Sequence, residues 1–172
     1  MEKCLDNAKN ALDSYYMKCK SAGDDHEIIK LAKNYFNWIS KKTNIISNEK
    51  EFTIPEDIKI KRGSVFWVDF GYNIDEEMGG RHPAIVLRTG GNTAIVVPLS
   101  TKEPSKKYID SGICVKIGKV WGFANMDRWV NVLNTTPISI QRFDFDSSFG
   151  NVKGKDLDNI REGMKKSGLW NR

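Results

Sequence analysis

The sequence predicts an α+β fold: an N-terminal αα-hairpin, then a small and strongly bent antiparallel β-barrel with a C-terminal helix. Apolar residues recur at helical spacing through residues 1–42. From residue 64 onward the pattern changes to short, alternating, β-branched runs. These runs lie too close together for crossover helices, which favours antiparallel pairing over a parallel α/β sheet.

Two helices are predicted in residues 1–42, joined by the segment SAGDD. The first apolar series is Leu5, Ala8, Leu12, Tyr15 and Cys19, and the second is Ile28, Leu31, Tyr35 and Trp38. Gly23 interrupts the pattern between the two series. Asp24, with Glu27 three residues later, predicts a capping box at the start of the second helix.

A linker and a barrel domain are predicted after the hairpin. Residues 43–57 are polar and without periodicity, which is typical of a linker, and residues 58–172 form the barrel domain. The predicted strands are GSVFWVDFG, PAIVLRT, NTAIVVPLS, GICVKI, RWVNVL and TTPISIQRF. Leu157, Ile160 and Met164 predict a closing helix, with Gly168 just past its end.

Composition excludes several classes of protein. The 172 residues are 40% hydrophobic and 28% charged, as in an ordinary globular protein. No run reaches the roughly 18 apolar residues of a membrane span, and the polar start lacks a signal-peptide pattern, so we expect a cytoplasmic protein. The three cysteines are Cys4, Cys19 and Cys114; their odd number and wide spacing favour reduced thiols over disulfides or a metal site.

The positive charge lies in the barrel domain. The net charge is +5, and residues 1–56 hold nine Lys and nine acidic residues. The rest of the chain therefore carries 18 of the 27 basic and 13 of the 22 acidic residues. This excess favours a polyanionic partner for the barrel.

Three ordered motifs carry a resemblance to a known family. The stretch KRGSVFWVDFGYNIDEEMGGRHPAIVL, followed by TAIVVPLSTKEP, resembles the MazF/PemK family of toxin endoribonucleases from toxin–antitoxin systems. The resemblance covers about residues 58–168. It implies an SH3-like barrel, a homodimer, metal-independent cleavage of single-stranded RNA such as mRNA, no cofactor, and inhibition by a cognate antitoxin protein. Residues 1–50 fall outside the family pattern and are interpreted as a helical extension.

The segment GGRHP departs from the family pattern. Many members have arginine immediately before the proline, and that arginine is catalytic. Here His82 occupies the catalytic column, before Pro83, and Arg81 stands one place earlier. Successive strand residues face opposite ways, although a glycine-rich loop could relax that rule. We hypothesise that Arg81 and His82 converge, with a hydroxyl from the next strand, on one anion-sized hollow.

The resemblance implies cleavage by the 2′-hydroxyl, which needs a base, an acid and positive charge for the phosphorane. His82 could be the base or acid, and Arg81 could hold the phosphorane through its planar fork. Ser100 stands in the column of a catalytic Thr or Ser, with Thr101 beside it, and Glu77 matches the family acid. Each also has a structural reading: an inert rim histidine, a polar strand end and a solvated loop carboxylate.

Candidate RNA-binding residues surround these positions. They are Lys102, Lys106, Lys107, Tyr72 and Arg128, and Arg142 is a further basic residue in the later strands. Lysine runs are also common on ordinary solvated surfaces, and aromatic residues of a small barrel are often core. No metal site is predicted, because His26 and His82 lie on different modules.

The leading hypothesis is therefore a sequence-selective endoribonuclease toxin. One alternative is a CcdB-like toxin that has the same barrel but binds a protein target such as DNA gyrase without cleaving anything. Another is a barrel that binds nucleic acid and has lost activity. Cleavage of RNA in EDTA separates the first hypothesis from the other two.

Overall fold

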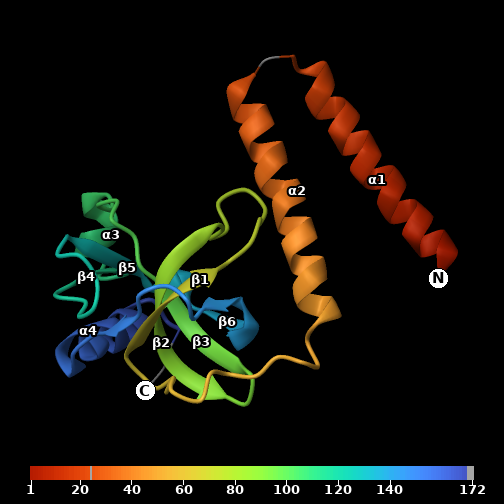
Figure 1. Cartoon of the computed structure of the whole chain (residues 1–172). Coiled ribbons are helices and arrows are strands. Elements are labelled where there is room, and N and C mark those ends of the chain that lie inside the picture. The colour runs from red at the N-terminus through yellow and green to blue at the C-terminus, as the bar shows by residue number, and fades with distance from the viewer. Residues whose placement is uncertain (24, 170–172) are drawn as a thin grey trace. The chain divides into compact units, whose positions relative to one another are not determined.

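The computed structural model describes residues 1–23 and 25–169 and has the predicted α+β fold (Figure 1). The chain divides into two compact units, Met1–Ser47 and Asn48–Arg172. The first is all helical. The second holds the strands and the remaining helices.

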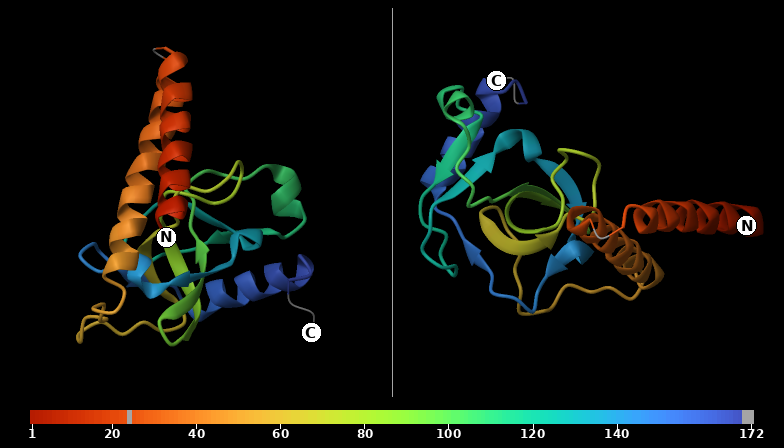
Figure 2. Two further views of the ribbon diagram at one scale, coloured as in Figure 1. Left: turned by 90° about the vertical axis from the view of Figure 1, so that its right-hand side faces the viewer. Right: turned by 90° about the horizontal axis from the view of Figure 1, so that it is seen from above.

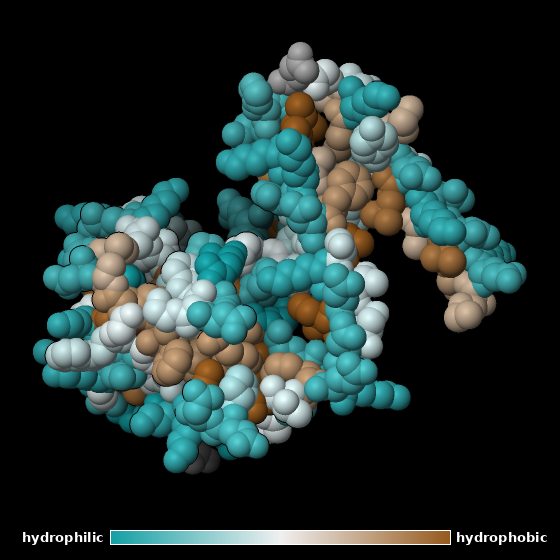
Figure 3. Space-filling view, in the orientation of Figure 1, coloured by the Kyte–Doolittle hydropathy of each residue, from teal (hydrophilic) through white to brown (hydrophobic). Residues whose placement is uncertain are grey.

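The first unit is an αα-hairpin of α1 (Glu2–Ser21) and α2 (His26–Ser47). Edge-to-face packing of Tyr15 on Tyr35, with ring centroids 5.2 Å apart, joins the helices. Several apolar side chains of the hairpin remain exposed (Figure 3): Leu5, Tyr16, Met17, Leu31 and Ile46. Among the helices described, none combines the length and the apolar character that crossing a membrane requires.

The start of α2 is capped by Asp25. Its side-chain oxygen accepts hydrogen bonds from the backbone N–H groups of Glu27, at 3.0 Å, and Ile28, at 3.3 Å. The capping box predicted from Asp24 lies outside the described residues. Asp25 supplies the acceptor that the first turn of a helix needs.

The segment predicted as a linker, 43–57, is helical at its start and packs against the sheet further on. Helix α2 continues through Ser47, because extending an existing helix adds one backbone hydrogen bond per residue without a new nucleation cost. The hydroxyls of Thr43 and Ser47 bond back to helix carbonyls four residues earlier. Further on, Phe52 and Ile54 pack against the apolar cluster of the sheet. Because the surrounding residues are polar, the sequence pattern did not show that Phe52 and Ile54 pack against the sheet.

The second unit is built on a curled antiparallel sheet (Figure 2). The strand order is β6-β3-β2-β1-β7, and β8 also pairs with β1. Its strands are β1 (Ser64–Asp69), β2 (Arg81–Gly90), β3 (Thr93–Pro98), β6 (Thr136–Ser139), β7 (Phe143–Asp144) and β8 (Gly150–Asn151). A second, two-stranded sheet pairs β4 (Cys114–Ile117) with β5 (Arg128–Asn131). The helices are α3 (Lys106–Asp110), η1 (Val132–Asn134), η2 (Ile140–Arg142) and α4 (Gly154–Lys166).

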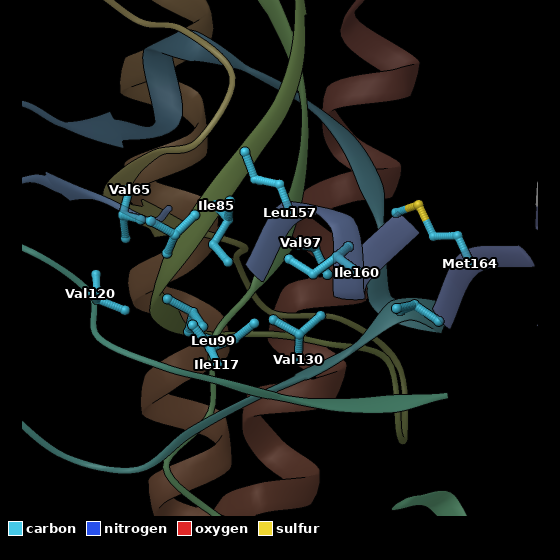
Figure 4. Packing of buried hydrophobic residues seen from close by; sticks show 12 residues of the cluster. Val65, Ile85, Val97, Leu99, Ile117, Val120, Val130, Leu157, Ile160 and Met164 are labelled. Carbon is cyan, nitrogen blue, oxygen red and sulfur yellow. The ribbon is translucent and has the colours of Figure 1, made fainter. Parts of the chain in front are cut away.

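The two faces of the curled sheet bury separate cores. One face packs Val65, Ile85 and Val97 against Leu157 and Ile160 of α4 (Figure 4). The opposite face buries a second cluster that includes Phe66, Val68, Phe70 and Ala84. Strand side chains alternate between faces, so each position along β1 and β2 is committed to one core or the other. This alternation fixes where the candidate site residues point.

Candidate active site at the start of strand β2

Glycines at the two ends of the β1–β2 loop, Gly71, Gly79 and Gly80, approach each other closely and form a narrow neck that sets the start of β2. The backbone N–H of Gly80 donates to the carbonyl of Gly71, at 2.6 Å, and the N–H of Phe70 donates to the carbonyl of Gly80, at 2.8 Å. Gly80 has a φ of +76°, and a Cβ at Gly79 would lie 3.0 Å from the Gly71 carbonyl oxygen. Larger residues would open this neck. Regular strand pairing begins at the next residue, Arg81.

Arg81 and His82 point to opposite faces of β2, and the hypothesis that they converge on one hollow is wrong. Arg81 pairs with Asp69 and His82 with Val68. The Arg81 guanidinium lies 4.5 Å from the centre of the Trp67 ring, whereas the His82 ring lies 6.5 Å from the Phe70 ring. The glycines lie before the strand, so they do not relax the alternation inside it.

The Arg81 side chain is occupied by protein partners. Its Nη2 donates to Asp144, at 2.5 Å, and to the Ser147 hydroxyl, at 2.7 Å. Burial works to raise the pKa of Asp144, but hydrogen bonds from Arg81, Ser147 and the backbone outweigh it and hold that pKa below its ordinary value. Arg81 therefore ties β2 to the turn after β7. Its charge is already balanced by Asp144.

His82 is partly buried and lies at the same end of the hairpin as Ser100. Burial lowers its pKa below 6.5, although hydrogen bonding with the backbone of Gly79 and Leu99 opposes that shift. The imidazole is therefore mostly neutral at neutral pH.

The register of β2 and β3 brings Ser100 toward His82. Ala84 pairs with Pro98, and the Leu99 N–H donates to the Pro83 carbonyl at 2.8 Å. Continuing this register by two residues sets Ser100 across from His82, on the same face. Ser100 then exchanges two backbone hydrogen bonds with Trp129, and its hydroxyl accepts from the Lys102 N–H at 3.1 Å.

The remaining candidates near this end lie on exposed loops. Thr101 and Lys102 follow Ser100 on the surface, and Lys106 and Lys107 form the start of the exposed helix α3. Glu77 accepts a hydrogen bond from the backbone of Ile74 at 3.2 Å, inside the β1–β2 loop. This exposed position agrees with the reading of Glu77 as a solvated loop carboxylate, and Arg81 bonds to Asp144. Tyr72 is partly buried in the same loop.

Arg128, expected on the RNA-binding surface, is buried instead. It is 4% exposed, and its guanidinium donates to the backbone carbonyl of Ala124 at 2.9 Å. It also lies 5.6 Å from the centre of the Phe123 ring. Arg128 therefore holds the loop before β5, because a buried guanidinium needs internal acceptors.

A polar pocket of about 450 Å³ lies beside the site and contains Arg142. It is lined by Phe70, Asn73, Glu77, Met78, Leu133, Asn134, Thr135, Thr136, Pro137, Ile138 and Arg142. Arg142 donates to the Phe70 carbonyl at 2.8 Å, and burial lowers its pKa while Asp69 opposes that shift. The sequence does not distinguish Arg142 from Arg128, because burial at either position is set by contacts that no local pattern reveals.

The described residues contain no group of three or more His, Cys, Asp or Glu side chains that could hold a metal ion. Cys4, Cys19 and Cys114 are free, and Cys19 and Cys114 are buried. Burial raises the pKa of the Cys114 thiol, which disfavours the reactive thiolate.

Comparison with known proteins identifies the class. A family model described as the PemK-like, MazF-like toxin of type II toxin–antitoxin systems matches residues 61–167. The match covers more than half of the chain, and the chain belongs to this family. Helices α1 and α2 lie outside the matched residues. A comparison with curated proteins found no match.

One solved structure supports the fold, and a second gives a weaker match. MazF (Form-I) from Deinococcus radiodurans has a TM-score of 0.52 and 16% sequence identity, covering 66% of this chain and 100% of its own. MazF-mt6 from Mycobacterium tuberculosis has a TM-score of 0.47 and 14% identity, covering 64% and 100%. At this identity, the first similarity establishes the shared fold and nothing finer.

Proposed function

We propose that this toxin is a metal-independent endoribonuclease that cleaves single-stranded RNA at the start of β2. Membership of the MazF/PemK family supports the reaction class. The observation that carries the proposal is the position of His82, partly buried, with a lowered pKa, and opposite the Ser100 end of β3. A neutral imidazole beside a hydroxyl is a suitable pair for proton transfer and phosphate binding.

In the proposed reaction the RNA supplies its own nucleophile. The 2′-hydroxyl oxygen attacks the adjacent phosphorus while His82 takes its proton. The bond from phosphorus to the 5′-oxygen then breaks, leaving a 2′,3′-cyclic phosphate, and the 5′-oxygen takes a proton from water. The protonated His82 gives its proton to the hydroxide that remains, which restores the neutral imidazole. Ser100 or Thr101 donates a hydrogen bond to a phosphate oxygen, and the exposed Lys102 supplies positive charge. Arg81 acts through Asp144, by fixing the strand that carries His82.

The partners follow from the family and from the surface charge. Lys102, Lys106 and Lys107 contact the RNA backbone on either side of the cleaved bond. The family description supports a cognate antitoxin as the inhibitor. We further propose a homodimer acting on cytoplasmic mRNA, on the family resemblance alone.

Incubating the full chain with a long single-stranded RNA in EDTA tests the proposal. We expect discrete fragments that carry 5′-hydroxyl ends, since the reaction needs no divalent metal. RNA that stays intact, with fully folded protein, would contradict the proposal. Growth arrest without RNA cleavage would instead support the CcdB-like alternative.

The pH dependence of cleavage reports on His82. A base works only when it is neutral, so kcat/KM should rise with pH through an inflection below 6.5 and then level off.

The lowered pKa also means that the unfolded chain binds more protons near pH 6, so the free energy of unfolding should fall as the pH drops below about 6.5. Initial rates and denaturation midpoints over the same pH series measure both. An inflection above 6.5 would rule out His82 as the base.

A further inference from the structure

An exposed tryptophan with two lysines lies apart from the candidate active site. Trp121, in the loop between β4 and β5, is 40% exposed. The ammonium of Lys119 lies 4.2 Å from the centre of its ring, and that of Lys153, which precedes α4, lies 5.0 Å away. Two segments that are distant in the sequence therefore bring positive charge to one exposed indole.

The backbone of Trp121 is held in place by its neighbours. The Trp121 N–H donates to the Asn151 carbonyl at 2.9 Å, and the Asn151 N–H donates to the Trp121 carbonyl at 3.0 Å. Gly122 has a φ of +87°, and a Cβ at Gly150 would lie 1.7 Å from the Trp121 carbonyl oxygen. Such close packing fixes the backbone from which the indole projects, so no loop has to be ordered when a ligand stacks on the ring.

The two lysines beside Trp121, Lys119 and Lys153, are without an ion pair in the described part of the chain. The neighbouring Asp156 carboxylate accepts a hydrogen bond from the Gly118 N–H, at 2.9 Å. Lys116 provides the contrast, because it lies 5.6 Å from the Trp129 ring but pairs with Asp127 at 2.9 Å. Trp129 is also buried, at 8% exposure. An exposed ring beside lysines that have no ion pair among the described residues favours an anionic and aromatic ligand.

We propose that Trp121, Lys119 and Lys153 form a second RNA-binding site, which stacks one unpaired base and binds the neighbouring phosphates. The indole offers its face to the base, and the lysines move from the ring onto phosphate oxygens. Taking RNA as the ligand rests on the proposed function. The site is separate from His82, because Asn151 pairs with Ser64 while His82 pairs with Val68, roughly 13 Å further along β1.

Binding of a strand that cannot be cleaved tests this site without relying on catalysis. A fluorescent 2′-O-methyl RNA of about twelve nucleotides spans such sites and lacks the 2′-hydroxyl nucleophile. By anisotropy, Trp121→Leu in the full chain should raise Kd at least about fivefold. Trp121→Phe, which keeps a ring, should raise it less. Lys119→Ala and Lys153→Ala should each reduce the salt dependence of log Kd by roughly 0.7.

Lys116→Ala is the matched control. Lys116 also lies over a tryptophan ring, that of Trp129, but its charge is already paired with Asp127. It should leave Kd and its salt dependence nearly unchanged. The inference would be overturned if Lys116→Ala and Lys119→Ala had equal effects, or if Trp121→Leu had none. It would also be overturned if a duplex of the same sequence bound equally well, or if the unmodified chain did not bind the RNA. Trp121-dependent binding by a chain that cleaves no RNA would refute only the endoribonuclease proposal.

Discussion

Replacing His82 with alanine is expected to lower the rate of RNA cleavage at least about 100-fold, the usual contribution of a general base. The imidazole is partly buried at the start of β2, and burial holds its pKa below the ordinary value, so it is mostly neutral at neutral pH. Removing it leaves the 2′-hydroxyl proton without an acceptor other than water. Single-turnover rates at saturating enzyme would measure the loss, with the melting temperature as a check on folding.

Arg81→Met is the matched control for this substitution, one residue earlier in the same strand. It removes the contacts with Asp144 and Ser147. The ion pair is partly exposed to solvent, which screens it, so we expect a loss of about 1 kcal/mol or less in the free energy of unfolding. Cleavage should fall by less than about tenfold, because Arg81 positions the strand and does not touch the phosphate. A folded Arg81→Met protein as inactive as His82→Ala would refute the assignment of roles.

Gly150→Ala is expected to be the most destabilising single substitution considered. The added Cβ would lie 1.7 Å from the Trp121 carbonyl oxygen and 3.1 Å from the Phe123 ring. Both the short β8 pairing and the loop that carries Trp121 would have to move. We expect a loss of at least about 3 kcal/mol, the range of severe overpacking. For a chain of this size, that lowers the melting temperature by about 6–12 °C.

Gly154→Ala is the control for that prediction. Gly154 is the first residue of α4, and a Cβ there meets no atom within 4 Å. Alanine should stabilise the chain slightly, by up to about 1 kcal/mol, because it restricts the unfolded state and favours the helix. Circular dichroism melting of the two variants should therefore move in opposite directions. A Gly150→Ala protein that melts like the unmodified chain would contradict the close packing at β8.

Periodicity in the sequence was enough to predict the hairpin, the curled sheet and the closing helix. Each shows as a pattern within a short stretch of sequence, such as the alternation of Val65 and Phe66 toward two cores. The same alternation separates Arg81 from His82. A glycine-rich loop could have weakened that rule, but Gly79 and Gly80 lie before the strand begins. The strand rule therefore applied in full.

The site could be predicted only in part, because its decisive contacts are long-range. Asp144, the partner that occupies Arg81, lies 63 residues further along the chain, at the end of a two-residue strand. Arg128 and Arg142 look alike in the sequence, but one is 4% exposed and the other lines a pocket. Which arginine is buried depends on how β5 and η2 pack. No motif of either segment encodes that packing.

The most direct test of the central claim uses the two histidines of the chain, His26 and His82. The imidazole nitrogens of both can be followed by NMR while a 2′-O-methyl RNA is added to the full chain. If the start of β2 binds the reacting phosphate, the signals of His82 shift on binding, while those of His26, on α2, stay in place. Saturating RNA that leaves the His82 signals unchanged would contradict a role for this residue in the reaction.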